Sequence, residues 1–381
     1  MSEEIKNLQE ELNDQMQIRR DKLAEYEADG IYPFGQRFVV KDHAKDIKND
    51  FLNYEDQPVV IAGRLMTMRS HGKTAFANIR DLSGDIQVYF RKDVLGEDNY
   101  KYVKMLDIGD IVGLEGHVFR THSGEVTIKV DKLTLLSKAL RPLPEKWHGL
   151  KDTELRYRQR YVDLIVNPEV RDTFVKRSKI VAKIREYMMN DGFMEVETPM
   201  MHPIPGGAAA RPFITHHNAL DIDIYMRIAP ELYLKRLIVG GMERVFEMNR
   251  CFRNEGIDNR HNPEFTTIES YQAYGDVEDA IRLTENIVSY CAQEVLGTQE
   301  ITYQGTEINL TPPWNRITMA EGVKKYTGED FDAVTTVEEA RAIADRLNVE
   351  YTNNDGIGKI LNLCFEDYVE ENLIQPTIVY G

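Results

Sequence analysis

Two runs of alternating side chains, separated by a polar connection, constrain the fold of this chain most strongly. Residues 244–274 read RVFEMNRCFRNEGIDNRHNPEFTTIESYQAY, and their period of two predicts two strands joined through residues 256–263. One face of each strand collects reactive groups: Glu247, Asn249, Cys251, Arg253 and Glu255 on the first, and Phe265, Thr267, Glu269 and Tyr271 on the second. Together these two faces could form an active site. The alternative is a surface hairpin with ordinary salt bridges.

The length and composition predict a protein of two or three domains that functions in the cytoplasm. The 381 residues are enough to bury a large core. No apolar run reaches the length of a membrane span, and the amino terminus lacks the features of a secretory signal. Cys251, Cys291 and Cys364 are odd in number and widely spaced, which favours buried thiols over disulfides or a zinc site.

The charge distribution limits how the chain could bind nucleic acid. The formal net charge is −16, from 47 Lys and Arg against 63 Asp and Glu, which argues against nonspecific binding through overall positive charge. Residues 51–140 contain 12 basic and 12 acidic residues. That segment is therefore neutral, and its charge permits an RNA-binding role.

The first third of the chain predicts a helix followed by a small barrel. Residues 1–50 are expected to form an amino-terminal helical extension, with a highly charged helix over residues 3–28. From residue 59 to 136, short strand-like runs alternate with turn signals. This pattern predicts a five-stranded OB-fold within residues 51–145.

One strand of this barrel carries an aromatic residue on its polar face. Alternation places Phe76 beside Asn78 and Arg80, and the next strand places Gln87 and Tyr89 on its polar side. Exposed rings among hydrogen-bonding groups suit stacking on unpaired bases, at roughly 1–3 kcal/mol for each base. The alternative is that Phe76 packs under a loop.

The segment LRPLPEKW at residues 140–147 predicts a linker between domains. A helix is expected after it, followed by a strand over residues 193–198 that Pro199 ends. Residues 297–375 are expected to form an inserted helical subdomain without catalytic groups, with a capping box at Thr336. The buried stripe of the first helix is predicted to consist of Phe174, Val181, Ile184 and Met188.

Two carboxylates point to a cationic ligand. Glu231 follows Pro230 at the start of a predicted helix, where the helix dipole favours a negative charge. Glu269 and Tyr271 share the strand face of Phe265. Taken singly, Glu231 could be a helix cap and Glu269 an exposed strand charge. In one pocket they would select an ammonium group.

The connection between the two strands also carries a family resemblance. FRNEGIDNRHNPEFT resembles motif 2 of class II aminoacyl-tRNA synthetases, and APELYLKRLIVGG narrows the resemblance to the lysyl-tRNA synthetases. The similarity runs from RRDK at residues 19–22 to LIQPT at residues 373–377. It implies a mixed α+β chain with an OB-fold that binds the anticodon and a class II catalytic domain, built on an antiparallel sheet, over residues 146–381. The helix and strand that end at Pro199 resemble motif 1, which implies a homodimer.

The resemblance implies specific roles in ATP binding. Activation joins a carboxylate to the α-phosphorus of ATP, so fixed cations must meet the phosphates. Arg253 corresponds to the arginine that holds the α-phosphate, and His261 to a histidine near the β- and γ-phosphates. Phe265 would stack on adenine, and Glu255 would accept a hydrogen bond from its amino group. Without the family, Arg253 could pair with a neighbouring glutamate and His261 could be a bystander.

The same resemblance implies the remaining partners. The chain is expected to be a lysine–tRNA ligase that uses ATP and Mg²⁺, acts on L-lysine and tRNA(Lys), and does not associate with membranes. No metal ligand is expected within this chain. The residues that correspond to lysine contacts are Gly207, Glu231, Glu269 and Tyr271, and those that correspond to anticodon contacts are Arg69, Phe76 and Gln87.

Family members continue beyond the position of residue 381 into motif 3, which supplies an arginine over adenine and acidic residues for magnesium. We therefore expect these 381 residues alone to show no lysine-dependent ATP–pyrophosphate exchange. A noncatalytic tRNA-binding module is one alternative. An aspartyl or asparaginyl enzyme is another, although an aspartyl enzyme needs cationic groups that the predicted pocket lacks. An enzyme that modifies a protein lysine is a third, but such relatives have no OB-fold.

Overall fold

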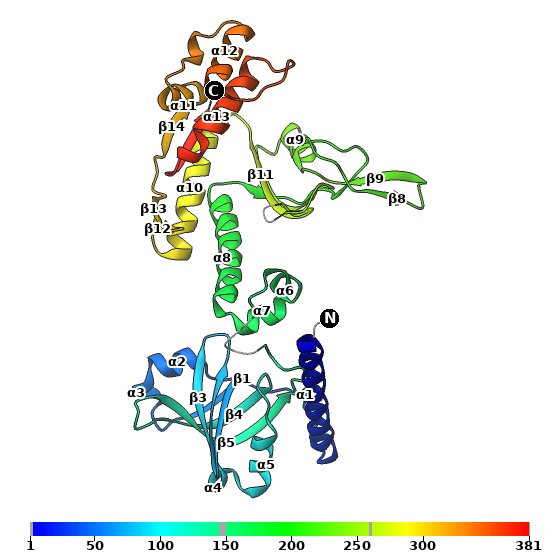
Figure 1. Ribbon diagram of the computed structural model, residues 1–381, viewed down its shortest axis with the longest axis vertical. Coiled ribbons are helices and arrows are strands. Elements are labelled where there is room, and N and C mark those ends of the chain that lie inside the picture. Colours follow the sequence, from blue (N-terminus) through cyan, green and yellow to red (C-terminus); the bar gives the residue numbers. More distant parts are fainter. Residues whose placement is uncertain (1–2, 145–149, 259–260, 381) are drawn as a thin grey trace. The chain divides into compact units, whose positions relative to one another are not determined.

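The computed structural model describes residues 3–144, 150–258 and 261–380, with side chains from residue 13 onward. The chain divides into two compact units, Met1–Val170 and Arg171–Gly381 (Figure 1). Residues 145–147 of the predicted linker lie outside the described residues, and residues 140–144 contain no helix or strand.

The amino-terminal unit contains a closed barrel with the strand order β1-β2-β3-β5-β4. β3 and β5 pair in parallel, and the other neighbours are antiparallel. Two helices connect β3 to β4, and the predicted OB-fold is confirmed. The elements are β1 (Pro58–His71), β2 (Thr74–Arg80), β3 (Asp85–Arg91), α4 (Lys92–Leu95), α5 (Glu97–Met105), β4 (Ile111–Arg120) and β5 (Val126–Ser137).

Alternation along the strands separates the barrel interior from its outer face. On β2, Ala75, Ala77 and Ile79 are buried, whereas Phe76 and Asn78 are half-buried. β3 alternates in the same way. Apolar side chains thus fill the interior, and the predicted placement of the polar face is confirmed.

A long helix packs against the barrel through its second half. α1 (Glu3–Ala28) confirms the predicted helix. Its Tyr26 is 1% exposed and donates a hydrogen bond to the Tyr102 carbonyl at 3.0 Å, while Arg19 donates to the Ala139 carbonyl at 2.9 Å. The unit also contains α2 (Ala44–Asn49), α3 (Phe51–Tyr54), α6 (Thr153–Arg158) and α7 (Arg160–Val166).

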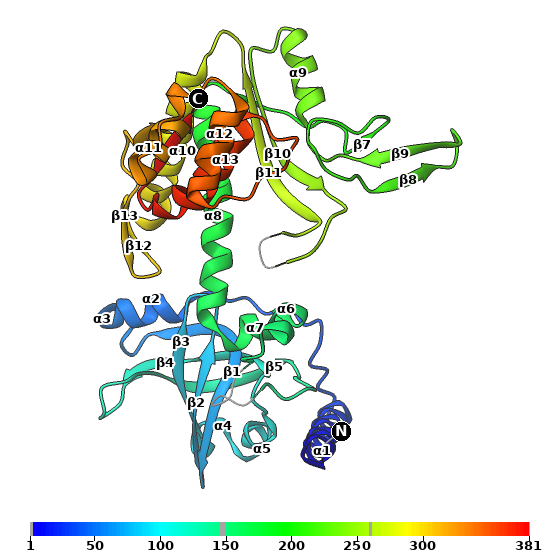
Figure 2. The ribbon, with the colours of Figure 1, turned by 45° about the horizontal axis from the view of Figure 1, so that its top comes forward.

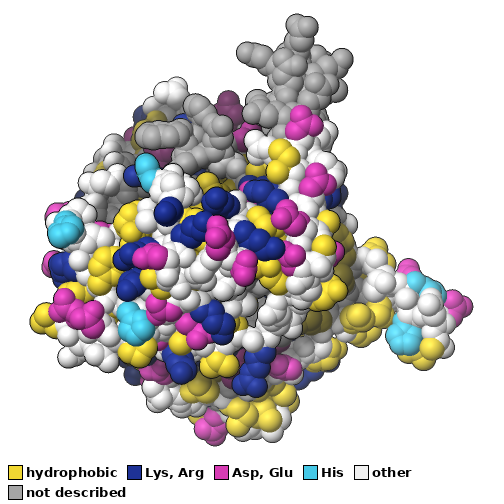
Figure 3. All heavy atoms as spheres, turned by 90° about the horizontal axis from the view of Figure 1, so that it is seen from below, with side chains coloured by type: hydrophobic (Ala, Val, Ile, Leu, Met, Phe, Trp, Pro, Cys, Tyr) yellow, Lys and Arg dark blue, Asp and Glu magenta, His cyan; other side chains and the backbone are white. Residues whose placement is uncertain are grey.

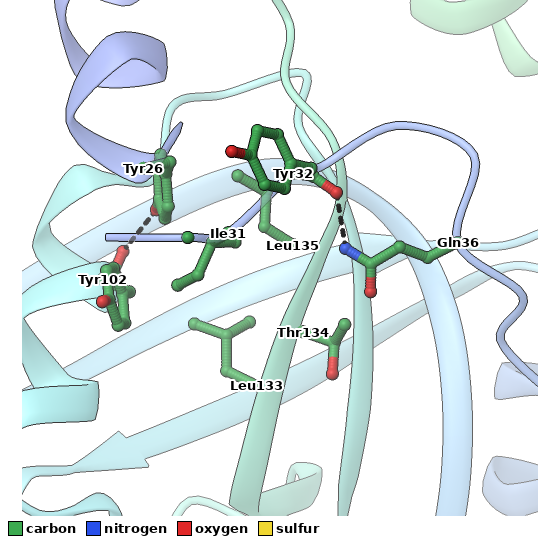
Figure 4. A pocket seen from close by; sticks show the side chains of 9 residues that line it. Tyr26, Ile31, Tyr32, Gln36, Tyr102, Leu133, Thr134 and Leu135 are labelled. Carbon is green, nitrogen blue, oxygen red and sulfur yellow. Dashed lines mark hydrogen bonds between the residues drawn. The ribbon is translucent and has the colours of Figure 1, made fainter. Parts of the chain in front are cut away.

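A cavity of about 420 Å³ lies where this helix meets the barrel (Figure 4). Tyr26, Tyr102 and Gln36 project toward it, and the Gln36 amide donates to the Tyr32 carbonyl. The lining side chains are uncharged. This cavity therefore lacks the groups needed to hold a triphosphate or an ammonium ion.

The carboxy-terminal unit contains several small sheets, of which β11-β10-β6 and β7-β9-β8 concern the site (Figure 2). Its first elements are β6 (Met194–Glu195), β7 (Met201–His202), β8 (Ile214–His217), β9 (Ile222–Met226), α9 (Glu231–Val239), β10 (Arg244–Phe252), β11 (Glu264–Gln272) and α10 (Val277–Leu296). They follow α8 (Pro168–Asn190), within which the two units divide.

Residues 300–380 combine a helical cluster with short strands. The Thr336 capping box is confirmed, because its hydroxyl accepts from the Glu339 amide and the Glu339 carboxylate accepts in return. The strands were not expected within an insert predicted to be helical. The elements are β12 (Glu300–Tyr303), β13 (Thr306–Asn309), β14 (Asn315–Thr318), α11 (Met319–Thr327), η1 (Phe331–Ala333), α12 (Val337–Leu347), α13 (Ile357–Tyr368), η2 (Glu370–Asn372) and β15 (Thr377–Tyr380).

Two local predictions were wrong. Phe174 was expected to be buried but is 43% exposed, because the buried cluster around α8 involves only its last turns, with Met188 at 0% exposure. The strand expected over residues 193–198 is limited to Met194–Glu195. The Val196 amide still bonds to the Phe246 carbonyl at 2.9 Å, and further on the Thr198 hydroxyl donates to the Glu247 carboxylate at 2.6 Å.

Candidate active site

The β10–β11 hairpin brings the two predicted strand faces together. Glu247 lies opposite Glu269, and Cys251 lies opposite Phe265, so the reactive residues within the two strands share one face. The strand β10 ends at Phe252, however, and Arg253 and Glu255 lie in the connecting loop rather than on the strand face. The Arg253 amide still bonds to the Pro263 carbonyl at 2.8 Å, and the Glu255 amide then turns back to the Arg253 carbonyl at 2.9 Å.

Three of the residues predicted to bind lysine interact electrostatically. The Tyr271 hydroxyl donates to Glu269 at 3.3 Å. Burial raises the pKa of the Glu269 carboxyl, and the negative charge of Glu231 raises it further. Burial, together with the two carboxylates, also raises the pKa of Tyr271. A carboxylate beside a second negative charge favours a bound cation.

Gly207 completes the wall beside Glu231. Its φ is +89°, and a Cβ built on it would lie 3.0 Å from the Glu231 Cβ and 3.1 Å from the Ala229 Cβ. The backbone therefore passes close to the first turn of α9, as only glycine allows without strain. The Gly207 backbone therefore lies close to the Cβ atoms of Glu231 and Ala229.

The expectation that this pocket lacks cationic groups was wrong. Lys235 Nζ lies 2.6 Å from a Glu231 oxygen and 5.8 Å from the centre of the Tyr271 ring. Glu231 and Lys235 are four residues apart in α9, the spacing that brings side chains together on one helix face. The Lys235 side chain is 57% exposed, so the pair is open to exchange with a ligand.

Arg253 and Phe265 lie together at the loop end of the hairpin. The Arg253 guanidinium lies 5.0 Å from the centre of the Phe265 ring. Its Nε is buried and has no hydrogen-bond partner among the described residues. The ion pair between Arg253 and a neighbouring glutamate, the alternative weighed from the sequence, is not found in the described part of the chain. An unsatisfied buried donor of this kind fits an incoming anion.

The other two residues predicted to bind ATP are exposed in the loop. Glu255 is exposed. His261 Nδ1 lies 2.8 Å from an Asp258 carboxylate oxygen, and the His261 backbone amide donates to the same carboxylate at 2.7 Å. Residues 259–260 lie outside the described residues. Contacts of Glu255 and His261 with ATP remain predictions.

The sequence analysis missed a buried ion pair beneath this face. Arg227 and Glu247 are each 1% exposed, and Arg227 Nη1 lies 2.6 Å from Glu247 Oε1. Arg227 also donates to the Arg250 carbonyl at 2.8 Å, while its NH2 has no partner among the described residues. The signal was available, because Arg227 stands between apolar neighbours in YMRIAPEL, where a charged residue needs a buried partner.

The barrel presents a second candidate site. Phe76 stacks on Tyr89, with ring centres 4.4 Å apart, and the β1–β2 register places the exposed Arg69 opposite Phe76. Gln87 lies on the same face, one pair along the strands. The alternative that Phe76 packs under a loop does not hold, because its packing partner is a neighbouring strand residue.

Charge on the molecular surface is mixed. On the face shown in Figure 3, Lys and Arg side chains are interspersed with Asp and Glu. Contact with an RNA there would depend on local residues rather than on a broad positive field. All three cysteines are free and buried, as predicted. No helix of the described residues is long and apolar enough to cross a membrane.

Comparisons with known proteins agree with this architecture. Residues 59–136 match the OB-fold nucleic acid binding domain, and residues 152–371 match the class II tRNA synthetases for D, K and N. The barrel and the hairpin sheet thus define a class II synthetase.

Curated relatives narrow the class. A lysine–tRNA ligase of Thermoanaerobacter pseudethanolicus is 57% identical over 379 residues, covering 99% of this chain and 76% of the relative. Those of Syntrophomonas wolfei and Oceanobacillus iheyensis are 57% and 55% identical, covering 96% and 98% of this chain and 74% and 77% of the relatives. The chain belongs to the lysine–tRNA ligase family.

Proposed function

We propose that this chain activates L-lysine with ATP to form lysyl-adenylate and transfers the lysyl group to tRNA(Lys) in the cytoplasm. The observation that carries the proposal is the acidic pair of Glu231 on α9 and Glu269 on β11, which interact electrostatically, together with the unsatisfied Nε of Arg253 at the loop end of the β10–β11 hairpin. An acidic pair suits a substrate with two ammonium groups. An aspartate side chain would be repelled by the same pair.

In the lysine site, Glu231 and Glu269 bind the ammonium groups, and Tyr271 orients the Glu269 carboxylate through its hydroxyl. Gly207 keeps the backbone close enough to confine the ligand. Lysine displaces Lys235 from Glu231, and Lys235 then extends into solvent. Binding fixes the substrate carboxylate for attack, which replaces an encounter in solution by a positioned reaction.

In the nucleotide site, Arg253 stabilises the negative charge that grows on the α-phosphate oxygens during attack. A planar guanidinium can hold two oxygens at once, and its burial strengthens the interaction. Phe265 supplies a ring face for adenine, Glu255 accepts from the adenine amino group, and His261 approaches the outer phosphates. Pyrophosphate leaves as the acyl–phosphate bond forms.

Magnesium is proposed only as a companion of ATP. The described residues contain no group of three or more His, Cys, Asp or Glu side chains that could hold a metal ion. We therefore assign it no ligand in this chain and derive no step through it.

The OB-fold is proposed to bind the anticodon, with Phe76 stacking on one base while Arg69 and Gln87 contact its polar edges. Stacking on a ring tolerates any base, whereas an amide distinguishes donors from acceptors. The neutral charge of this segment means that these local contacts, rather than phosphate attraction alone, determine binding.

A homodimer is proposed on the apolar side of α8. An apolar groove of about 260 Å³ lies between α8 and α10, lined by Ile180, Ile184, Ile287 and their neighbours. Exposed apolar patches of this kind favour association, and a second copy of the chain is the partner expected from the family. Sedimentation of an Ile184→Asp variant as a monomer would support this interface.

Thermal stabilisation tests the substrate assignment. Lysine with ATP should raise the melting temperature, since a ligand at 100 times its Kd contributes about 2.7 kcal/mol, and aspartate or asparagine with ATP should not. Glu269→Gln should remove the lysine effect and keep the effect of ATP alone. Equal stabilisation by aspartate would contradict the proposal.

A noncatalytic tRNA-binding role is the second candidate, and the complete barrel favours it. ATP–pyrophosphate exchange separates the two roles. Lysine-dependent exchange by these 381 residues would exclude a purely tRNA-binding role.

A further inference from the structure

A buried hydroxyl lies directly behind the amide of Gln87. Thr127 on β5 is 0% exposed, and its Oγ1 is 2.8 Å from Gln87 Oε1. The two residues face each other in the parallel β3–β5 register. The contact is therefore positioned by the barrel backbone, not by two mobile side chains.

We propose that Thr127 fixes the orientation of the Gln87 amide and thereby makes Gln87 a hydrogen-bond donor toward the anticodon. This inference rests on the proposed binding of tRNA by the OB-fold. A glutamine amide carries an acceptor oxygen and a donor NH₂ group. When the Thr127 hydroxyl donates to the oxygen, the NH₂ group points away from β5.

The neighbouring ring shows where this donor would act. Phe76 pairs with Tyr89 across β2 and β3, and Asn78 pairs with Gln87 two residues along. Phe76 and Gln87 thus lie on the same outer face, in adjacent rows. Because Tyr89 stacks against one side of Phe76, a base stacked on the other side would bring its polar edge toward Gln87.

A fixed donor distinguishes the two pyrimidines. Lysine codons begin with two adenines, so the anticodon bases that pair with them are uracils. Uracil offers a carbonyl oxygen at the position where cytosine offers an amino group. A donating amide binds the uracil oxygen, whereas cytosine would set two donors against each other. A freely rotating amide could satisfy either base.

A purely structural role for Thr127 makes a different prediction. Its Oγ1 is also 3.1 Å from the Glu125 carbonyl, and a hydroxyl has a single hydrogen to donate. If that hydrogen belongs to Glu125, loss of the hydroxyl changes stability but not the choice of base. The ratio of affinities for two anticodons separates the two roles, since a change in stability alters both affinities equally.

The experiment uses the full chain and tRNA(Lys) transcripts with uracil or cytosine at each of the two anticodon positions. Equilibrium dissociation constants are measured for wild type, Thr127→Val, Thr127→Ser and Gln87→Glu. At one of the two anticodon positions, Thr127→Val should reduce the ratio of uracil to cytosine affinities about tenfold, equivalent to about 1.4 kcal/mol. Thr127→Ser should keep the preference within about twofold, and Gln87→Glu, which only accepts, should shift it toward cytosine.

A Thr127→Val protein with the wild-type ratio at both positions would overturn the inference, even if all its affinities fell together. If Thr127→Val fails to fold, Gln87→Glu tests the inference, because this variant leaves the buried Thr127 hydroxyl in place. An unchanged ratio of uracil to cytosine affinities in Gln87→Glu would also refute the donor role of Gln87. If wild type itself showed no uracil preference, the proposed anticodon contact at Gln87 would fail together with this inference.

Discussion

Replacing Arg227 by methionine should destabilise the carboxy-terminal unit severely. The Arg227 guanidinium pairs with Glu247 at 2.6 Å and donates to the Arg250 carbonyl at 2.8 Å and to the Thr198 hydroxyl at 3.2 Å. Methionine fills a similar volume but provides none of these hydrogen bonds. Glu247, which is 1% exposed, would then keep a charge with no cation beside it.

The magnitude follows from the burial of both partners. Removing one member of a buried ion pair costs about 3–5 kcal/mol, because the remaining charge cannot be solvated. The Glu247 carboxylate also accepts from Thr198 and Asn249, which offsets part of that cost. We therefore expect about 3 kcal/mol for Arg227→Met. Arg227→Met combined with Glu247→Leu should cost less than the single change, since no charge is then left buried.

Urea unfolding of the carboxy-terminal unit measures this loss. Trp314 lies in that unit, and Trp147→Phe makes it the only tryptophan of the chain, so fluorescence then reports on this unit alone. Val245→Ala, a buried change on the same strand, serves as a control for general loss of packing. The reasoning is refuted if Arg227→Met costs less than about 1 kcal/mol, or if the double variant is less stable than Arg227→Met alone.

Other predictions concern the two sites. Because the pKa of Glu269 is raised in the folded state, the neutral carboxyl stabilises the fold, and this stability is lost as the pH rises through that pKa. Glu269→Gln should therefore increase the free energy of unfolding at neutral pH, measured by urea titration. The same variant should abolish lysine binding, measured by calorimetry. In wild type, lysine affinity should fall on acidification at a higher pH than for an ordinary glutamate, and Glu269→Gln should lose this dependence. Gly207→Ala should lower the free energy of unfolding by about 1–2 kcal/mol because of its left-handed φ. It should also weaken lysine binding by calorimetry, because the added Cβ would lie 3.0 Å from the Glu231 Cβ and displace that side chain. Phe76→Ala should weaken tRNA binding by about 1–3 kcal/mol in a filter assay, and an unchanged affinity would contradict the stacking role.

The strand faces of both sites could be predicted because a period of two is a local property. Phe76 and Glu269 each lie on the face that alternation assigns. The end of the first strand could not be predicted in the same way. Alternation continues through Glu255, whereas β10 ends at Phe252 and the Glu255 amide turns back to the Arg253 carbonyl, a loop hydrogen bond that the pattern cannot show.

The residues that support the sites could not be predicted from local patterns. Arg227 and Glu247 are 20 residues apart, and only the folded sheet shows that they pair. The same is true of Thr127 and Gln87, which are 40 residues apart and meet through a parallel strand pair. Sequence patterns identify the side chains that face a ligand, whereas the residues behind them depend on which distant strands become neighbours.

The charges around the proposed lysine site show why the supporting residues matter for function as well as the residues that face the ligand. Burial raises the pKa of Glu269, and the negative charge of Glu231 adds to this effect. The positive charge of Arg227 lowers the pKa of Glu269 and so opposes the effect of burial. The Nη1 atom of Arg227 is already paired with Glu247. Lys235 reaches Glu231 from the exposed side and is free to leave. The acidic pair is therefore partly neutralised by two cations: Arg227, which is fixed, and Lys235, which can exchange. A substrate ammonium can replace Lys235 without first breaking a buried ion pair.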